Sequence, residues 1–245
     1  MANFRNLTVK DSYKLTPHLQ RVIFEGEDLQ DFPHDQEGAY VKVILENDKN
    51  TIEKSGKKPR MRSYTIAQFD EKNKVLALDF MVSSHEGHTT NWALNSKVGD
   101  SIVIAGPGPR KMNDFPLTDY LFFVDLTSIN TLRAYLNLVP NEATGKAIVL
   151  IPTEDDKVDL PAHANIKVQY SLISDLGQYE QFARSYNKLN ENTIVFAAGE
   201  AKEVAQLKAF LKNETQVTKG NMFMSGYWKR GRTDEEYRAE KKKEK

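Results

Sequence analysis

The chain has 245 residues, 34 lysines and arginines against 34 aspartates and glutamates, and no cysteine. A net charge of zero excludes nucleic-acid binding driven by overall charge, although not a local basic patch. The lack of cysteine excludes disulfides, thiolate zinc sites, cysteine nucleophiles and thiolate-bound iron–sulfur clusters, so redox chemistry would need an organic cofactor or a partner. The polar, charged start, without a long apolar run behind it, predicts a cytosolic protein outside the membrane.

The first half of the chain predicts a small antiparallel β-barrel, because its apolar and polar residues alternate in short stretches separated by turn residues. Six short strands without long helices are typical of that fold. The predicted strands are residues 6–13, 19–25, 40–45, 61–68, 75–82 and 101–105. A cluster of glycine and proline at 106–109 ends this pattern, so we expect a barrel domain over residues 1–109.

The strand at 61–68 carries the first chemical signal. Arg62 and Tyr64 are two residues apart, so on a strand they point to one face. An arginine fork suits phosphate oxygens, and a tyrosine offers a flat face for a ring. Thr65 can hydrogen-bond a polar ring edge. These three residues predict a site for a large, flat, phosphate-bearing cofactor, although an amphipathic strand with a surface arginine is the alternative on these residues alone.

A short helix is predicted to begin near Thr89, with Thr89 and Thr90 as capping residues. The free N–H groups of a helix N-terminus bind phosphates well, and Gly87 would let the backbone approach closely. His85 and His88 lack a third ligand nearby, so no metal site is predicted here.

The second half predicts a parallel α/β sheet, because apolar strands alternate with helical patterns. The predicted strands are 120–124, 147–151, 166–170, 193–197 and 222–224, and the predicted helices are 132–139, 179–189 and 200–212. We expect an α/β domain over residues 110–245, closed by a C-terminal helix that Thr233 begins. Ligands of such folds bind beyond the carboxyl ends of the strands. The segments expected to meet in one crevice there are Asp125-Leu126-Thr127, Ala198-Gly199-Glu200 and Gly226-Tyr227-Trp228.

Further motifs follow the Arg62–Thr65 element in a fixed order: Asp79-Phe80-Met81-Val82, then residues 87–93 with Trp92, then 98–107. Near the C-terminus come residues 197–201 and then the stretch Ser225-Gly226-Tyr227-Trp228-Lys229-Arg230-Gly231-Arg232. Of all these motifs, this last stretch is the most specific for one protein family. With these motifs the chain resembles the siderophore-interacting proteins, which are FAD-containing ferric-siderophore reductases of the ferredoxin-reductase-like superfamily.

The resemblance implies an FAD site on the barrel and electron transfer through the flavin, without an acid–base catalyst. It implies that Arg62 binds the flavin phosphate, Tyr64 packs on the ring system and Thr65 bonds to it. Trp228 would be an aromatic cover, or else a half-buried packing residue. The full set expected at the cofactor is Arg62, Ser63, Tyr64, Thr65, Asp79, Phe80, Met81, Gly87, His88, Thr89, Thr90, Trp92 and Trp228.

The resemblance also implies a ferric siderophore as substrate and NADH, NADPH or ferredoxin as electron donor. The residues expected to bind substrate or donor are Asp125, Thr127, Gly199, Glu200, Lys229, Arg230 and Arg232, the last three as a basic lip. The family pattern Asp-Glu-Thr-Ala-Leu-Pro is matched at Asp125 and Thr127 but not at Leu126 or Asn130. Ser83-Ser84 replaces the usual His-Gly, and no glycine-rich dinucleotide fingerprint follows any strand.

Two other functions remain open from the sequence. One is an electron-transfer flavoprotein whose basic face docks a ferredoxin or flavodoxin. The other is a β-barrel binding module without flavin.

Overall fold

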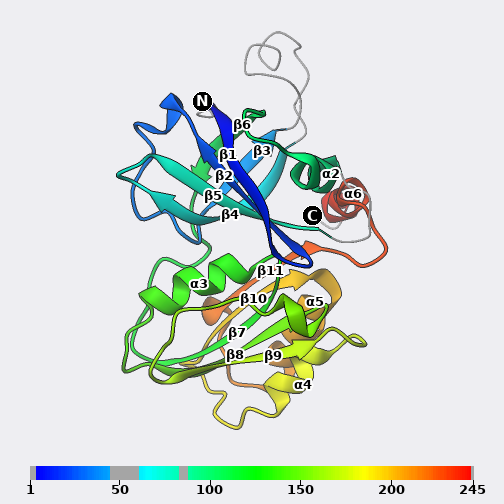
Figure 1. Ribbon diagram of the computed structural model, residues 1–245. Coiled ribbons are helices and arrows are strands. Elements are labelled where there is room, and N and C mark those ends of the chain that lie inside the picture. Colours follow the sequence, from blue (N-terminus) through cyan, green and yellow to red (C-terminus); the bar gives the residue numbers. More distant parts are fainter. Residues whose placement is uncertain (1–3, 45–60, 83–87, 244–245) are drawn as a thin grey trace. The chain divides into compact units, whose positions relative to one another are not determined.

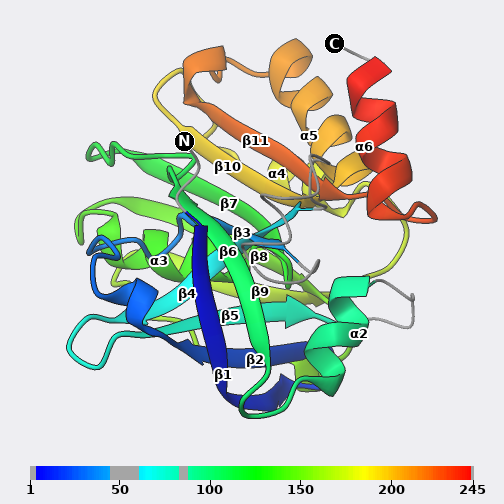
Figure 2. The same ribbon diagram turned by 90° about the horizontal axis from the view of Figure 1, so that it is seen from above.

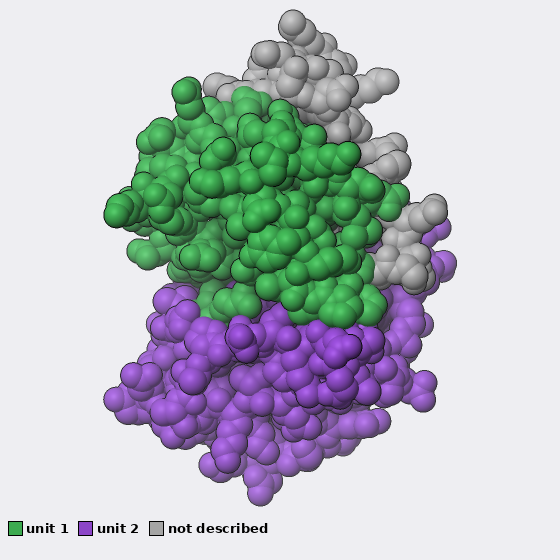
Figure 3. All heavy atoms as spheres, viewed as in Figure 1, with its two compact units in different colours: residues 1–111, 133–135 green, residues 112–132, 136–245 purple. Residues whose placement is uncertain are grey.

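The computed structural model describes residues 4–44, 61–82 and 88–243. The chain forms two compact units (Figure 3). The first contains Met1–Lys111 and Arg133–Tyr135, and the second contains Met112–Leu132 and Leu136–Lys245.

The first unit is a closed antiparallel barrel with the strand order β1-β2-β5-β4-β3-β6 (Figure 1). Its strands are β1 (Phe4–Thr16), β2 (Leu19–Glu25), β3 (Tyr40–Ile44), β4 (Met61–Asp70), β5 (Val75–Met81) and β6 (Ser101–Gly108). The 3-10 helix η1 (Glu27–Leu29) follows β2, and α2 (His88–Asn95) lies beside β2 and β5 (Figure 2). The structure therefore confirms the predicted six-stranded barrel.

The barrel core follows from the period of two along each strand, because alternate residues point inward. Leu7 and Val9 on β1, Phe24 on β2 and Phe80 on β5 belong to one buried apolar cluster. Each such side chain contributes about 1.5–3 kcal/mol when it leaves water completely. Ala93 of α2 is a buried member of this cluster and Trp92 packs against it, and both contacts hold the short helix to the barrel.

One strand end differs from the prediction. Glycine and proline were expected to stop β6 at Ala105, but the strand continues to Gly108, which pairs with Tyr40. A register shift opposite Val41 lets the chain accommodate Pro107, which has no N–H to donate. A Cβ at Gly108 would overlap the ring of Tyr40, so a larger residue there would require that ring to move.

The second unit is a five-stranded sheet with the order β11-β10-β7-β8-β9, all of it parallel, as predicted. The strands are β7 (Asp119–Asp125), β8 (Thr144–Ile151), β9 (Ile166–Leu172), β10 (Ile194–Glu200) and β11 (Met222–Trp228). The helices are α3 (Ile129–Leu138), α4 (Gln178–Arg184), α5 (Ala201–Glu214) and α6 (Asp234–Lys243), with 3-10 turns η2 (Glu154–Asp156) and η3 (Lys219–Asn221). None of the helices in the described part of the chain has the length and apolar character needed to span a bilayer.

From β7 the chain adds β8 and β9 towards one edge of the sheet, and it then returns to add β10 and β11 towards the other edge. Right-handed crossovers therefore place α3 on one face of the sheet and α4 and α5 on the other. The helix predicted at 179–189 ends at Arg184, where Ser185 and Tyr186 donate backbone hydrogen bonds back into the last turn. Tyr186 is nevertheless buried in the apolar cluster with residues of α4 and α5. Its place in the apolar pattern of the sequence therefore indicates burial and does not indicate a helix. β11 is longer than expected and carries Trp228 as its last residue.

Candidate functional site

The candidate cofactor face lies on β4. Arg62 and Tyr64 are both half-buried, while Ser63 between them is exposed on the opposite face. A guanidinium N–H of Arg62 donates to the carbonyl oxygen of Met61 at 3.2 Å, which holds the side chain along the strand. Thr65 is half-buried and lies opposite Tyr40 of β3. The strand thus places an arginine fork and an aromatic ring side by side, as the spacing predicted.

The ring of Tyr64 rests on other aromatic rings. Its centroid lies 4.4 Å from that of Phe80, and the two planes are tilted by 44°. Phe80 in turn lies 6.0 Å from Trp92, and Trp92 stacks on Phe24 at 6.2 Å. Pairs of this kind contribute about 0.5–1.5 kcal/mol beyond their buried area. Phe80 and Trp92 therefore fix the position of Tyr64 from below, and Phe80 itself is fully buried.

Asp79 of β5 forms an ion pair with Arg21 of β2. Both of its carboxylate oxygens accept from the guanidinium of Arg21 at 2.7 Å, and its side chain is 1% exposed. This bond raises the pKa of Arg21 further above its usual value. Asp79 and the half-buried Met81 lie on the face of β5 opposite Phe80, so the expected cofactor residues of this strand divide between two faces.

The helix expected at Thr89 begins one residue earlier, at His88. Thr89 is buried and Thr90 is half-buried, and both lie inside the first turn and not at the cap position that was predicted. Gly87, Ser83, Ser84, His85 and the side chain of His88 lie outside the described residues. Among the residues that are described, no three histidines or carboxylates gather closely enough to hold a metal ion.

The donor set on β4 and α2 fits a phosphate-bearing flavin. A planar guanidinium two residues from a half-buried tyrosine supplies charge for phosphate and a surface for a ring. The aromatic residues beneath Tyr64 hold its ring in place, so little side-chain entropy is lost when a ligand stacks on it. The α2 N-terminus adds backbone N–H groups for a pyrophosphate.

A second cluster lies in the other unit, at the carboxyl end of β7. The carboxylate of Asp125 accepts from the backbone N–H of Thr127 at 2.9 Å, from the Thr127 hydroxyl, and from the indole N–H of Trp228 at 2.7 Å. Burial raises the pKa of Asp125, while these hydrogen bonds act in the opposite direction. Asp125 is 2% exposed, so its polar atoms are satisfied inside the protein.

The neighbouring strand β10 supplies the other predicted residues of this cluster. Gly199 has φ 140°, and a Cβ there would lie 2.5 Å from an Asp125 oxygen and 3.0 Å from the Tyr179 hydroxyl. Glu200 caps α5, because its carboxylate accepts from the backbone N–H groups of Lys202 and Glu203. The other oxygen of Glu200 accepts from the backbone N–H of Arg230 at 3.0 Å, which ties the segment after β11 to β10.

The structure thus brings Asp125, Thr127, Gly199, Glu200 and Trp228 together, as their places at strand ends predicted. Their polar atoms bond to one another, so the cluster also fixes the ends of three strands. Three further residues of this network were missed, and each bonds to backbone far away in sequence. They are Ser128, which donates to the carbonyl of Ala198 at 2.9 Å, Tyr179, which donates to the same carbonyl, and Glu203, which accepts from Gly177 N–H at 2.7 Å.

The expected basic lip is paired with the C-terminal helix. Lys229 and Arg232 both bond to the carboxylate of Glu240 on α6, the arginine at 2.8 Å. Hydrogen bonds from these two cations lower the pKa of Glu240. Arg230 turns elsewhere, and its guanidinium donates to the carbonyl of Ser174 at 3.3 Å. Two of the three lip cations are therefore paired with one carboxylate, and the third bonds to a backbone carbonyl.

Comparison with known proteins adds independent findings. The family model described as the siderophore-interacting FAD-binding domain matches residues 8–111, and the model described as siderophore-interacting protein matches residues 117–231. The ferric vibriobactin reductase ViuB of Vibrio cholerae is 28% identical over 244 residues, covering 93% of this chain and 90% of the relative.

Solved structures give the same result for the fold. The siderophore-interacting protein SipS of Aeromonas hydrophila superposes with a TM-score of 0.79 at 25% identity, covering 92% of this chain and 98% of the other. The siderophore-interacting protein of Acinetobacter baumannii superposes with a TM-score of 0.82 at 21% identity, covering 98% of each chain.

Proposed function

This chain belongs to the siderophore-interacting protein family, and we propose on that premise that it reduces the Fe(III) of a ferric siderophore with electrons from FAD. It is an FAD-dependent oxidoreductase of ferredoxin-reductase-like fold. The observation that carries the proposal is the β4 face, where Arg62 and a supported Tyr64 ring lie together on a barrel that matches an FAD-binding domain.

Reduction releases the metal because siderophores bind hard Fe(III) through oxygen ligands, whereas the softer Fe(II) is held far more weakly. Bound FAD accepts electrons as a pair and releases them singly, which a one-electron reduction of iron requires. With a nicotinamide donor, one NAD(P)H reduces two ferric ions and releases one proton. No acid–base group of the protein has to act on the chelator.

The residues of the barrel would hold the cofactor. Arg62 binds a phosphate of FAD, and Tyr64 stacks on the ring system above Phe80 and Trp92. Thr65 supplies a hydroxyl to the polar edge of the ring system, and the N-terminus of α2 accepts the pyrophosphate. Arg21 keeps Asp79 neutralised, so that no free carboxylate of β5 opposes the phosphate charge.

The donor would be NADH or NADPH, with reduced ferredoxin as the alternative. In the second unit, the backbone N–H of Thr127 in the turn after β7 donates to the buried carboxylate of Asp125. This N–H is therefore already bonded and does not serve a pyrophosphate at this turn. We therefore propose that a dinucleotide does not bind at this turn by its pyrophosphate. We also propose that the reaction takes place in the cytosol, where both donors are found.

Anaerobic stopped-flow absorbance tests the function. Chemically reduced protein is mixed with ferric hydroxamate, catecholate and carboxylate siderophores, and a chromogenic chelator traps Fe(II). We expect the oxidised flavin spectrum to return rapidly with at least one class, with two Fe(II) trapped per flavin. Flavin that stays reduced against every chelate, but is oxidised by ferredoxin or flavodoxin, would refute the reductase proposal and favour the electron-transfer flavoprotein.

The basic lip predicts that two kinds of substitution change the rate of flavin oxidation by anionic chelates in opposite directions. Replacing Lys229 and Arg232 together by alanine should lower the flavin oxidation rate with anionic chelates about tenfold, because charge steers association on this scale. Neutral chelates should be little affected. Glu240→Gln, which removes the carboxylate paired with both cations, should raise the rate with anionic chelates severalfold.

Salt provides the control for this pair of variants, because electrostatic attraction is screened at high ionic strength. The differences should shrink between 0.05 and 0.5 M salt, concentrations at which the Debye length falls from roughly 14 Å to 4 Å. Equal effects on anionic and neutral chelates, or a Glu240→Gln rate below that of the wild type, would contradict a charge-based lip.

A further inference from the structure

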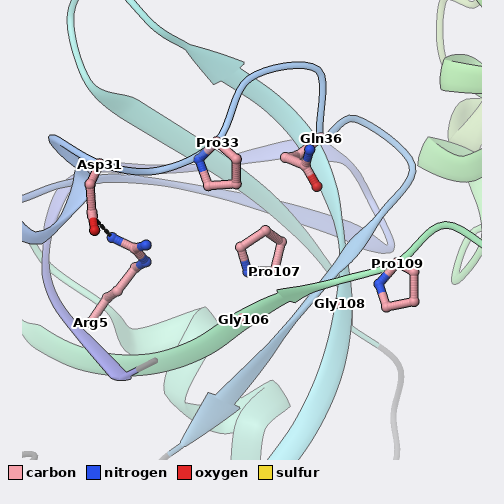
Figure 4. Close-up of a pocket in the computed structure, with 8 residues that line it drawn as sticks. All are labelled: Arg5, Asp31, Pro33, Gln36, Gly106, Pro107, Gly108 and Pro109. Atoms are coloured by element: carbon pink, nitrogen blue, oxygen red, sulfur yellow. Dashed lines mark hydrogen bonds and ion pairs between the residues drawn. The ribbon is translucent and has the colours of Figure 1, made fainter. Parts of the chain in front are cut away.

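A pocket of about 550 Å³ lies on the barrel unit (Figure 4). It is lined by Arg5 of β1, by Asp31, Pro33 and Gln36 from the segment between η1 and β3, and by residues 106–109 at the end of β6. Its size is within the range typical of small-molecule sites. The strands of this pocket, β1 and β6, do not pair with β4 directly, although Gly108 pairs with Tyr40 of β3, which lies opposite Thr65.

Arg5 lies at the base of the pocket, and its position is unusual for an arginine. It precedes Leu7 by two residues, so it points into the barrel, and it is only 4% exposed. One terminal nitrogen, Nη1, donates both to the carbonyl of Asp28 and to the carboxylate of Asp31. The guanidinium also lies over the ring of Phe32, 5.3 Å from its centroid.

The other edge of the Arg5 guanidinium has no hydrogen-bond partner among the described residues. Nε is buried and unpaired, and among the described residues no hydrogen bond is made by Nη2 either. A buried donor left unpaired costs about 1–3 kcal/mol. The Nε–Nη2 edge is a face of the fork that binds a carboxylate through two parallel hydrogen bonds. Figure 4 shows this edge on the side of the guanidinium that faces Pro107.

The rest of the pocket combines proline rings with few side-chain donors. Figure 4 shows the guanidinium of Arg5 at one end, the ring of Pro107 in the middle and the ring of Pro109 at the far end. Prolines, including Pro33 on the opposite wall, have no backbone N–H to offer an anion. The amide nitrogen of Gln36 donates to the carbonyl of His34 at 2.6 Å, which fixes that side chain.

The charges at the pocket also restrict the ligand. Asp31 is 76% exposed at its side chain and bonds to Arg5 only through Nη1. The guanidinium holds the pKa of Asp31 below its usual range, so this carboxylate is charged at neutral pH. One cation beside one anion does not favour a doubly charged phosphate, whereas a monoanion with an apolar body matches one fork and three proline rings.

We propose that this pocket binds a small organic carboxylate with a flat, apolar body, the carboxylate on Nε and Nη2 of Arg5 and the body along Pro107. The residues that line this pocket are not among those expected at the flavin or at the chelate, so the carboxylate would bind there without taking part in electron transfer.

Benzoate is a suitable probe, with benzamide as its neutral counterpart of the same shape and inorganic phosphate as the competing anion class. Calorimetric titration into the FAD-loaded protein should show benzoate binding at least tenfold more tightly than either. Arg5→Lys, which keeps the charge but loses the fork, should weaken benzoate at least tenfold. Asp31→Asn should tighten benzoate severalfold, because it removes a like charge and a competitor for Arg5.

Asp11→Asn, an exposed change on the same strand β1, is the matched control and should leave benzoate affinity unchanged. Flavin absorbance should stay constant at saturating benzoate, which separates this pocket from the cofactor face. The proposal is overturned if benzamide or phosphate binds as tightly as benzoate, if benzoate displaces FAD, or if Asp31→Asn leaves benzoate affinity unchanged or lowers it. Asp31→Asn decides alone if Arg5→Lys does not fold, because Asp31 is exposed and asparagine keeps an oxygen that can accept from Arg5.

Discussion

Arg62→Ala is expected to weaken FAD binding about 150-fold. A charge-assisted hydrogen bond contributes about 1.5–3 kcal/mol, and losing a two-donor contact to phosphate at the half-buried Arg62 would therefore cost about 3 kcal/mol. The purified variant should lose its yellow colour on dilution and ultrafiltration, and its dissociation constant can be measured by flavin fluorescence during reconstitution. Tyr64 and its aromatic support remain intact, so circular dichroism should show a folded barrel.

Lys42→Ala is the control for this experiment. Lys42 lies on β3 opposite Ser63, so it is an exposed cation next to β4. Removing it changes the net charge by the same amount without touching the expected phosphate contact. If both variants retain FAD equally well, Arg62 has no role at the phosphate, and the flavin would have to be held by other residues.

Asp125→Ala should lower the free energy of unfolding by about 4 kcal/mol, because it leaves at least two buried donors without an acceptor. Thr127 N–H and the indole N–H of Trp228 both point at this carboxylate. For a chain of this length, such a change lowers the melting temperature by about 10 °C. The tertiary environment of Trp228 should change with it, as near-ultraviolet circular dichroism can show.

Asp155→Ala, an exposed aspartate of η2 in the same unit, should change stability by less than about 0.5 kcal/mol. Trp228→Phe should reproduce part of the Asp125→Ala effect, because it removes one of the donors and leaves the carboxylate in place. A melting temperature for Asp125→Ala within two degrees of the wild type would mean that the carboxylate is not a structural centre, and would make direct binding of the donor the better interpretation.

The sequence predicted both the barrel and the parallel sheet well, because burial imposes a period on the apolar residues of each strand and helix. The Arg62–Tyr64 pair was recognised for the same reason: two residues on a strand face one way whatever the tertiary structure. Failures occurred where long-range contacts overrule local preference. Pro107 continues β6 because Tyr40 offers a pairing partner, and α4 stops early although Tyr186 stays buried.

The chemistry of the second unit was less predictable. Trp228 and Asp125 are 103 residues apart, so no spacing indicates that one bonds to the other. The pairing of the basic lip with Glu240 depends on where α6 folds back, which composition does not specify. Arg5 was not recognised at all, because its partners Asp28 and Asp31 become neighbours only when the barrel closes.

Barrel closure also has a consequence for biosynthesis. β1 pairs with β6, so the first strand made has to wait until residues 101–105 have left the ribosome before both of its edges are covered. The parallel sheet needs still more chain, since its central strand β7 pairs with β10, which begins at Ile194. Domains fold as units during synthesis, N-terminal first. We therefore expect the cofactor face to be complete, and able to capture flavin, while the second half of the protein is still being translated.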